Sequence, residues 1–207
     1  MVDRRTILAL ALLAPVAALG GCETLEVNAD DLSAGGDQVI LVRGLANIFS
    51  TGLDKLGEKL EDRGITPRVV GLGSPEKRAA TIAANYRAGN GRGAVVLVGH
   101  SYGADEAMRI ARALRAERVP VDLLVTFDPT ISGPVSANVR RAVNYHTTNE
   151  GLWGPVKPAQ GFKGQLLNIN VGKGEGSETG ERVNHFNVEK ADKLHDTAIN
   201  EIRRALR

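Results

Sequence analysis

The chain has 207 residues, of which 43% are hydrophobic, with 26 Lys and Arg against 24 Asp and Glu and a formal net charge of +2. This length and hydrophobic content suit one globular domain with a buried core. Because the charges nearly balance and no basic stripe is interleaved with aromatic residues, the sequence does not indicate nucleic-acid binding.

The first 22 residues predict an export signal rather than a part of the fold. A short charged region, Asp3–Arg5, precedes an apolar run over 6–19 that is too short to span a bilayer comfortably and ends in small residues. This layout is typical of a secretory signal peptide. The next stretch, Leu19-Gly20-Gly21-Cys22, is similar to the lipobox of bacterial lipoproteins, in which the peptidase cuts before a cysteine that carries a diacylglycerol.

Cys22 is the only cysteine of the chain, which fits a thiol used for attachment because it has no partner for a disulfide. The resemblance implies a signal peptide over 1–21 and a chain held on a membrane by lipid at Cys22. The polar segment 22–37 then serves as a tether. We expect the protein in the bacterial cell envelope, on the periplasmic face of the outer membrane, with which Glu23 beside the cysteine is compatible.

The remaining segment, 38–207, alternates apolar runs with segments of helical periodicity. The apolar runs predict strands over 38–43, 67–72, 94–98, 121–127, 142–147 and 165–171. The helical spacing predicts helices from 53 to the closing Gly64, over 75–88, over 103–117 and from about 189 onward. Strands that alternate with helices imply an α/β domain with a mostly parallel sheet and helices on both faces.

One predicted strand ends in Gly99-His100-Ser101-Tyr102-Gly103, directly before a predicted helix. A serine on such a tight turn is forced into a strained backbone conformation, and its neighbours two residues away must be small because strand and helix nearly touch. The turn lifts the hydroxyl of Ser101 above the carboxyl edge of the sheet, where α/β folds bind ligands.

At this point segment 38–207 resembles the α/β-hydrolase family, in a compact form without a cap domain. The resemblance implies that Ser101 is a nucleophile, activated by a histidine base that a carboxylate orients, in the chain order serine, acid, histidine. His185 lies between the last predicted strand and the last helix, where the family keeps its base.

Two carboxylates compete for the role of the acid. Asp128 follows the fourth strand at the same edge of the sheet, although an Asp-Pro pair also suits a turn. Glu150 follows the next strand, where many hydrolases carry the acid. We expect Asp128 and keep Glu150 as the alternative.

The other histidines have structural interpretations. His100 lies inside the turn and is expected to pack rather than to act in catalysis, and His146 lies within a strand. His195 is expected on the polar or flanking face of the last helix.

Two backbone N–H groups are needed to hold an oxyanion. The resemblance assigns them to Tyr102, after the nucleophile, and to Leu45, in the loop after the first strand. Many family members have His-Gly in that loop, and this chain has Arg43-Gly44. Arg43 is either structural or attracts an acidic group of the substrate.

The sequence predicts no cofactor and no metal. The stretch Gly71-Leu72-Gly73-Ser74-Pro75 lacks the third glycine of a dinucleotide fingerprint, and no Cys/His cluster indicates zinc. Trp153, between glycines and prolines, either forms a wall of an acyl pocket or packs within its own loop.

The expected function is that of a serine hydrolase that cleaves a carboxylic ester or thioester, such as a lipid or a small acyl ester. Two alternatives stay open. The chain is a binding or scaffold lipoprotein on a hydrolase fold, or it transfers the acyl group to an alcohol other than water.

Overall fold

A computed structural model describes residues 36–45, 51–131, 133–172 and 183–207. The expected signal peptide over 1–21, Cys22 and most of the expected tether lie outside the described residues, so these assignments stay predictions. Within the described ranges, no helix is long and apolar enough to cross a membrane.

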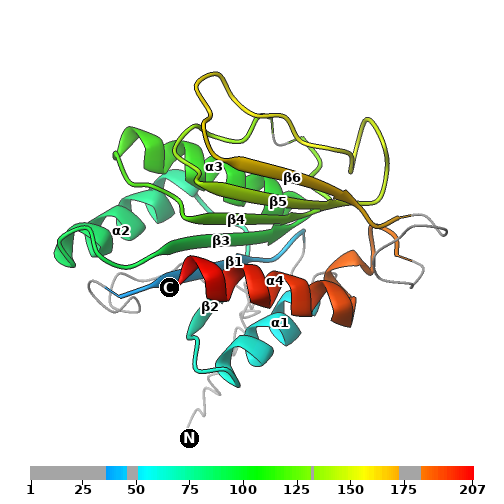
Figure 1. Ribbon diagram of the computed structural model, residues 1–207, viewed down its shortest axis with the longest axis horizontal. Helices are drawn as coiled ribbons and strands as arrows, with labels where there is room; N and C mark the ends of the chain where they lie inside the picture. The colour runs from blue at the N-terminus through cyan, green and yellow to red at the C-terminus, as the bar shows by residue number, and fades with distance from the viewer. Residues whose placement is uncertain (1–35, 46–50, 132, 173–182) are drawn as a thin grey trace, which may run out of the picture.

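Six parallel strands form one sheet in the order β2-β1-β3-β4-β5-β6 (Figure 1). The strands are β1 (Gln38–Val42), β2 (Pro67–Val70), β3 (Val95–His100), β4 (Leu123–Phe127), β5 (Arg141–His146) and β6 (Gln165–Asn170). The chain runs outward from β1 to β2 and then returns to β3 on the other side of β1. The order therefore reverses between β1 and β3, and in open α/β sheets such a point opens a crevice at the carboxyl ends of the strands.

In the described parts of the chain, four α-helices cover the sheet on both faces. They are α1 (Gly52–Glu61), α2 (Pro75–Ala88), α3 (Tyr102–Ala116) and α4 (Asp192–Ala205). Helices α2 and α3 lie on one face, and α1 and α4 lie on the other (Figure 1). The predicted α/β class with a parallel sheet is confirmed, and the described residues contain no cap domain between the strands.

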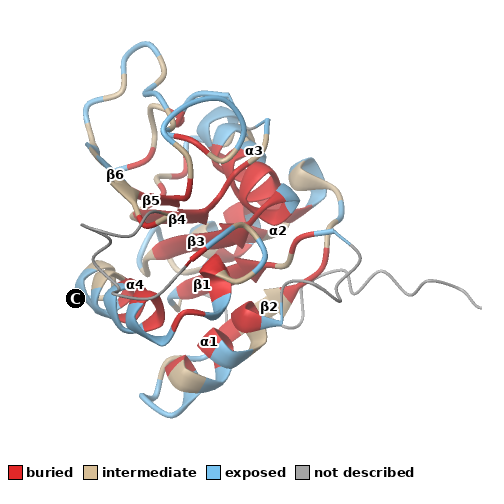
Figure 2. Cartoon of the chain, turned by 90° about the vertical axis from the view of Figure 1, so that its right-hand side faces the viewer, coloured by how far each residue is buried: buried red, intermediate tan, exposed pale blue. Residues whose placement is uncertain are grey.

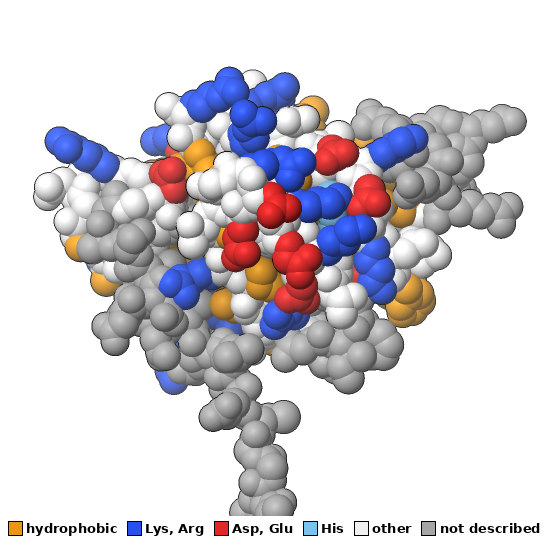
Figure 3. All heavy atoms as spheres, turned by 90° about the horizontal axis from the view of Figure 1, so that it is seen from below, with side chains coloured by type: hydrophobic (Ala, Val, Ile, Leu, Met, Phe, Trp, Pro, Cys, Tyr) orange, Lys and Arg blue, Asp and Glu red, His pale blue; other side chains and the backbone are white. Residues whose placement is uncertain are grey.

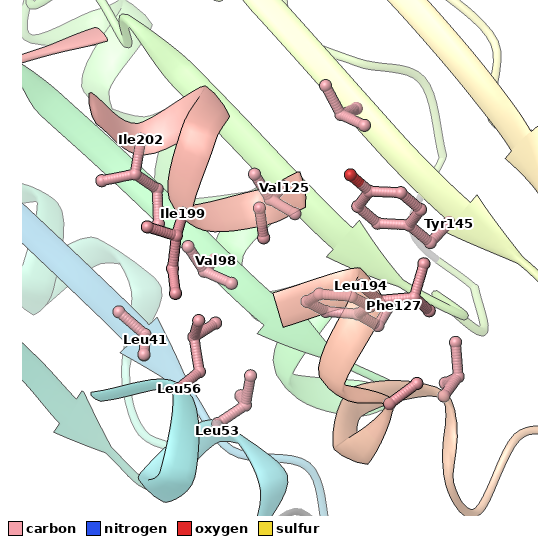
Figure 4. Close-up of a cluster of buried hydrophobic side chains, with 14 of the residues drawn as sticks. Leu41, Leu53, Leu56, Val98, Val125, Phe127, Tyr145, Leu194, Ile199 and Ile202 are labelled. Carbon is pink, nitrogen blue, oxygen red and sulfur yellow. The ribbon is translucent and has the colours of Figure 1, made fainter. Parts of the chain in front are cut away.

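Two hydrophobic cores result from the alternation of side chains along the strands. In β1, Ile40 and Val42 pack toward α2 and α3, while Val39 and Leu41 pack toward α1 and α4. Figure 4 shows the second core, where Leu53 and other side chains from both helices meet the central strands. The middle strands are buried on both faces, whereas the edge strand β6 is only partly covered (Figure 2).

The exposed side of α1 and α4 carries interspersed positive and negative side chains (Figure 3). Lys55 and Lys59 of α1 both reach Asp192 at the start of α4, with N–O distances of 2.9 and 2.8 Å. These exposed ion pairs join the two helices across the surface, although such pairs add little stability each.

The predicted elements are all present, with shifts at their ends. Helix α4 begins at Asp192 rather than near Glu189, because Ala191 has an extended backbone (ψ 117°) and Val188–Lys190 forms a separate 3-10 helix, η2. The expectation for His195 is wrong. Its ring is fully buried on α4, where Nε2 lies 2.6 Å from the backbone carbonyl oxygen of Glu189.

Candidate active site

Ser101 lies between β3 and α3 with φ 55° and ψ −126°, a region that L residues rarely occupy. The small neighbours are required by sterics. A Cβ on Gly99 would come within 2.4 Å of the carbonyl oxygen of Gly103, and a Cβ on Gly103 would come within 2.1 Å of the carbonyl oxygen of Val42. The sharp turn expected from the sequence is therefore present.

The structure brings Ser101, His185 and Asp128 together at the carboxyl edge of the sheet. The Oγ of Ser101 lies 3.1 Å from Nε2 of His185, and Nδ1 of the same ring lies 3.4 Å from Oδ2 of Asp128. The second distance is long for a hydrogen bond, and such contacts often shorten when a ligand binds. An imidazole so placed can accept the hydroxyl proton while the carboxylate holds its tautomer.

Asp128 is fully buried at the end of β4. Its carboxylate accepts two hydrogen bonds of 2.7 Å from Thr147, one from the backbone N–H and one from the hydroxyl. These bonds fix the carboxylate and stabilise its charge. Glu150, the alternative acid, is exposed and contributes its backbone carbonyl to Thr148. The structure thus places Asp128, and not Glu150, beside His185.

Aromatic rings enclose His185. Trp153 stacks on the imidazole with 4.1 Å between ring centroids, and Phe186 meets it edge-on at 5.4 Å. The backbone carbonyl of His185 accepts a 2.9 Å hydrogen bond from Nε2 of His100. His100 is buried, as expected, and it also secures the loop that carries His185. His146 is buried as well, with Nδ1 2.7 Å from the carbonyl oxygen of Thr148.

A cavity of about 280 Å³ opens over Ser101. It is lined by Leu45, His100, Ser101, Tyr102, Trp153, His185 and Phe186. Within the described residues, neither Tyr102 nor Leu45 donates its N–H group to a backbone carbonyl, and both residues line the cavity. Tyr102 also begins α3, whose positive end faces the site.

Arg43 has a structural role, since its guanidinium forms an ion pair with Asp54 of α1. The pair joins the residue that follows β1 to α1, two positions before Leu45. Trp153, for which two interpretations were open, forms a wall of the cavity and stacks its ring on His185, while its backbone carbonyl accepts hydrogen bonds from Thr147 and Thr148 of its own loop.

The structure adds one titratable group that sequence reasoning missed. Glu189 lies in η2 and is fully buried, and burial raises the pKa of its carboxyl group to about 7. Burial also lowers the pKa of the neighbouring His100 to about 4. No signal in the sequence separates Glu189 from a solvent-facing helix residue. Within the described residues, no group of three His, Cys, Asp or Glu side chains could hold a metal.

No family model matches the sequence, and no curated protein is similar to it in sequence. Solved structures do resemble it. Lipase B of Aspergillus fumigatus matches with a TM-score of 0.54 and 13% identity over 95% of this chain, which spans 62% of that lipase. RedJ with a polyethylene glycol molecule in its active site matches with a TM-score of 0.51 and 14% identity over 96% of both chains.

A further structure of RedJ, described as a thioesterase from the prodiginine biosynthetic pathway in Streptomyces coelicolor, has a TM-score of 0.49 at 14% identity, over 91% of this chain and 96% of that one. The architecture that this chain has in common with its neighbours is the α/β-hydrolase fold, as the sequence predicted.

Proposed function

We propose that the protein is a serine hydrolase that cleaves a carboxylic ester or thioester through an acyl-enzyme at Ser101. One observation carries the proposal. The hydroxyl of Ser101, on a turn with positive φ, lies 3.1 Å from an imidazole nitrogen whose ring is backed by the buried carboxylate of Asp128.

In the proposed reaction, His185 takes the hydroxyl proton as the Oγ of Ser101 attacks the carbonyl carbon. The N–H groups of Tyr102 and Leu45 bind the oxyanion of the tetrahedral intermediate. His185 then protonates the leaving alcohol or thiol, and the acyl group stays on the serine. Water, deprotonated by the same imidazole, releases the acid. Asp128 holds the tautomer and stabilises the imidazolium.

The surroundings of the site favour an acyl substrate. Its cavity is lined by Leu45, Tyr102, Trp153 and Phe186, and three of these side chains are also exposed to solvent. Such a lining binds hydrocarbon better than charge. We further propose, from the lipobox, that Cys22 holds the enzyme on a membrane of the bacterial envelope.

The test is hydrolysis of a p-nitrophenyl ester by the wild type and by Ser101→Ala. We expect the variant to lose at least about a thousandfold in kcat/KM with an unchanged melting temperature. Ser136→Ala is the matched control, since this buried hydroxyl has no hydrogen bond within the described residues. Equal turnover by Ser101→Ala would reject the proposal. A folded wild type without turnover would favour the scaffold interpretation.

A further inference from the structure

A buried carboxylate lies behind the proposed base. Glu189 is 0% exposed, and within the described residues no side chain donates a hydrogen bond to its carboxylate. The backbone N–H groups of Gly52, at the start of α1, and of Glu189 itself favour its charged form without reaching full hydrogen-bond geometry. Burying a carboxylate without a side-chain partner is costly, and proteins that keep one commonly use it. The proposed mechanism has not yet required this group.

His100 connects Glu189 to His185. Its Nε2 donates to the carbonyl oxygen of His185 at 2.9 Å and lies 3.9 Å from Oε2 of Glu189. The rings of His100 and His185 are 5.0 Å apart between centroids. The imidazole of His100 therefore lies between the carboxylate of Glu189 and the proposed base. Its Nε2 faces two acceptors, the carbonyl oxygen of His185 and Oε2 of Glu189.

The other groups around Glu189 come from η2, from α1 and from α4. Lys190, in η2 itself, has its Nζ 3.8 Å from Oε1. The amino end of α1 approaches closely, since a Cβ on Gly52 would come within 2.1 Å of the carbonyl oxygen of Glu189. From α4, the ring of His195 donates to that same carbonyl, and the charges that act on this ring are those of the exposed Asp192 and of the lysines of α1.

We propose that Glu189 is a positioning residue for His185, a proposal that rests on the proposed hydrolase function. It acts through His100 and, when ionised, stabilises the imidazolium that forms as Ser101 loses its proton. Asp128 remains the group in direct contact with the imidazole. Glu189 adds a second negative charge on the opposite, buried side of the loop that carries the base.

The direction of the effect follows from the titration of the pair. Burial raises the pKa of Glu189 to about 7 and lowers the pKa of His100 to about 4, so that near neutral pH only Glu189 changes charge. Below pH 7 the carboxyl group is protonated and the added charge is absent. Above pH 7 the carboxylate is present and can stabilise the positive charge that develops on the proposed base during the reaction.

The test is the pH profile of p-nitrophenyl ester hydrolysis by the wild type, by Glu189→Gln and by the control Glu58→Gln, whose exposed carboxylate lies on α1. We expect kcat of Glu189→Gln to fall about tenfold at pH 8 and less at pH 6, with KM unchanged. Glu189→Asp is expected to restore most of that loss, and the control to change nothing.

If Glu189→Gln does not fold, Glu189→Asp takes its place, with a smaller loss of kcat expected at pH 8 and no loss at pH 6. A folded Glu189→Gln with the kcat of the wild type at pH 8, or with an equal loss at pH 6 and pH 8, would overturn the proposal. A failure of this coupling leaves the turnover of the wild type and its loss in Ser101→Ala intact, so it is distinguishable from a failure of the hydrolase function.

Discussion

Backbone strain at the scale of single residues is concentrated at the candidate site. Within the described residues, five non-glycine residues have positive φ, and three of them are Ser101, Asp128 and Trp153. Each such conformation costs free energy, so it persists only where contacts with the surrounding structure hold the residue in place. Ser101, Asp128 and Trp153 are therefore held in place by the fold rather than by their own conformational preferences.

Glu189 also predicts a pH dependence of stability. Its pKa in the fold, about 7, lies above the ordinary value of 4.5, so the folded state binds the proton more tightly. Its stabilising contribution is fully present below pH 4.5 and is lost as the pH rises through 7. The free energy of unfolding of the wild type, minus that of Glu189→Gln, is expected to fall by about 3 kcal/mol between pH 4 and pH 8.

Urea unfolding of both proteins at each pH measures this difference. His100 and His195 are present in both chains, so their opposite pH dependence largely cancels in the subtraction. A difference that stays constant across the range would contradict the raised pKa.

At the scale of elements, the contact between the end of β1 and α3 determines the position of Ser101. Gly103 lies where the first turn of α3 passes over the end of β1, and a Cβ added there would lie 2.1 and 2.5 Å from the carbonyl oxygens of Val42 and Arg43. Backbone atoms cannot move aside as the end of a flexible side chain can. Any side chain at 103 would therefore push the helix away from the strand.

We expect Gly103→Ala to lower the free energy of unfolding by about 3 kcal/mol or more, because the added methyl group meets fixed backbone. Gly64→Ala is the control. Gly64 has a positive φ of 74° but no heavy atom within 4 Å of an added Cβ, and its change is expected to cost about 1 kcal/mol. Equal losses in the two variants, measured by urea unfolding, would show that the contact is not the constraint.

The elements were predictable because hydrophobic periodicity is local. The run Val95–Val98 and the helical spacing of Ile82 and its neighbours each lie within one segment, so β3 and α2 follow from short windows of sequence. The break at Ala191 and the buried ring of His195 were not predictable. Both depend on how η2 packs against α1, which involves residues more than a hundred positions away.

At the scale of the whole molecule, exposed apolar side chains gather at one edge. The segments that follow β1, β3, β4, β5 and β6 each present one, and in a parallel sheet these segments begin at the carboxyl edge that holds the candidate site. These side chains are Leu45, Tyr102, Ile131, Leu152 and Phe186, each at least 42% exposed. They are isolated in the sequence, so only the assembled sheet reveals them as a group.

This apolar edge predicts a preference for longer acyl chains. We expect kcat/KM to rise severalfold from p-nitrophenyl acetate to the butyrate, since each buried methylene contributes about 0.8 kcal/mol. Phe186→Ala is expected to reduce that preference, while Leu167→Ala, an exposed leucine on the edge strand β6, leaves it unchanged. If Phe186→Ala left the butyrate-to-acetate ratio of kcat/KM unchanged, the apolar edge would not be the cause of the preference.

The candidate site was predictable in part for a related reason. Motif and chain order indicated Ser101 and His185, because parallel strands bring their carboxyl ends to one edge whatever the distance in sequence. The choice between Asp128 and Glu150 depended on which loop reaches the imidazole, which is a property of the packed fold. In the packed fold, two hydrogen bonds from Thr147 hold the carboxylate of Asp128 in place.

The most direct test of the central claim is to treat the folded protein with a fluorophosphonate and locate the adduct by peptide mass spectrometry. Such a probe reacts with a serine only when a base activates its hydroxyl. We predict one adduct, on Ser101, that is absent in His185→Ala. A folded wild type without an adduct at Ser101, or equal labelling of Ser101 in His185→Ala, would contradict the account.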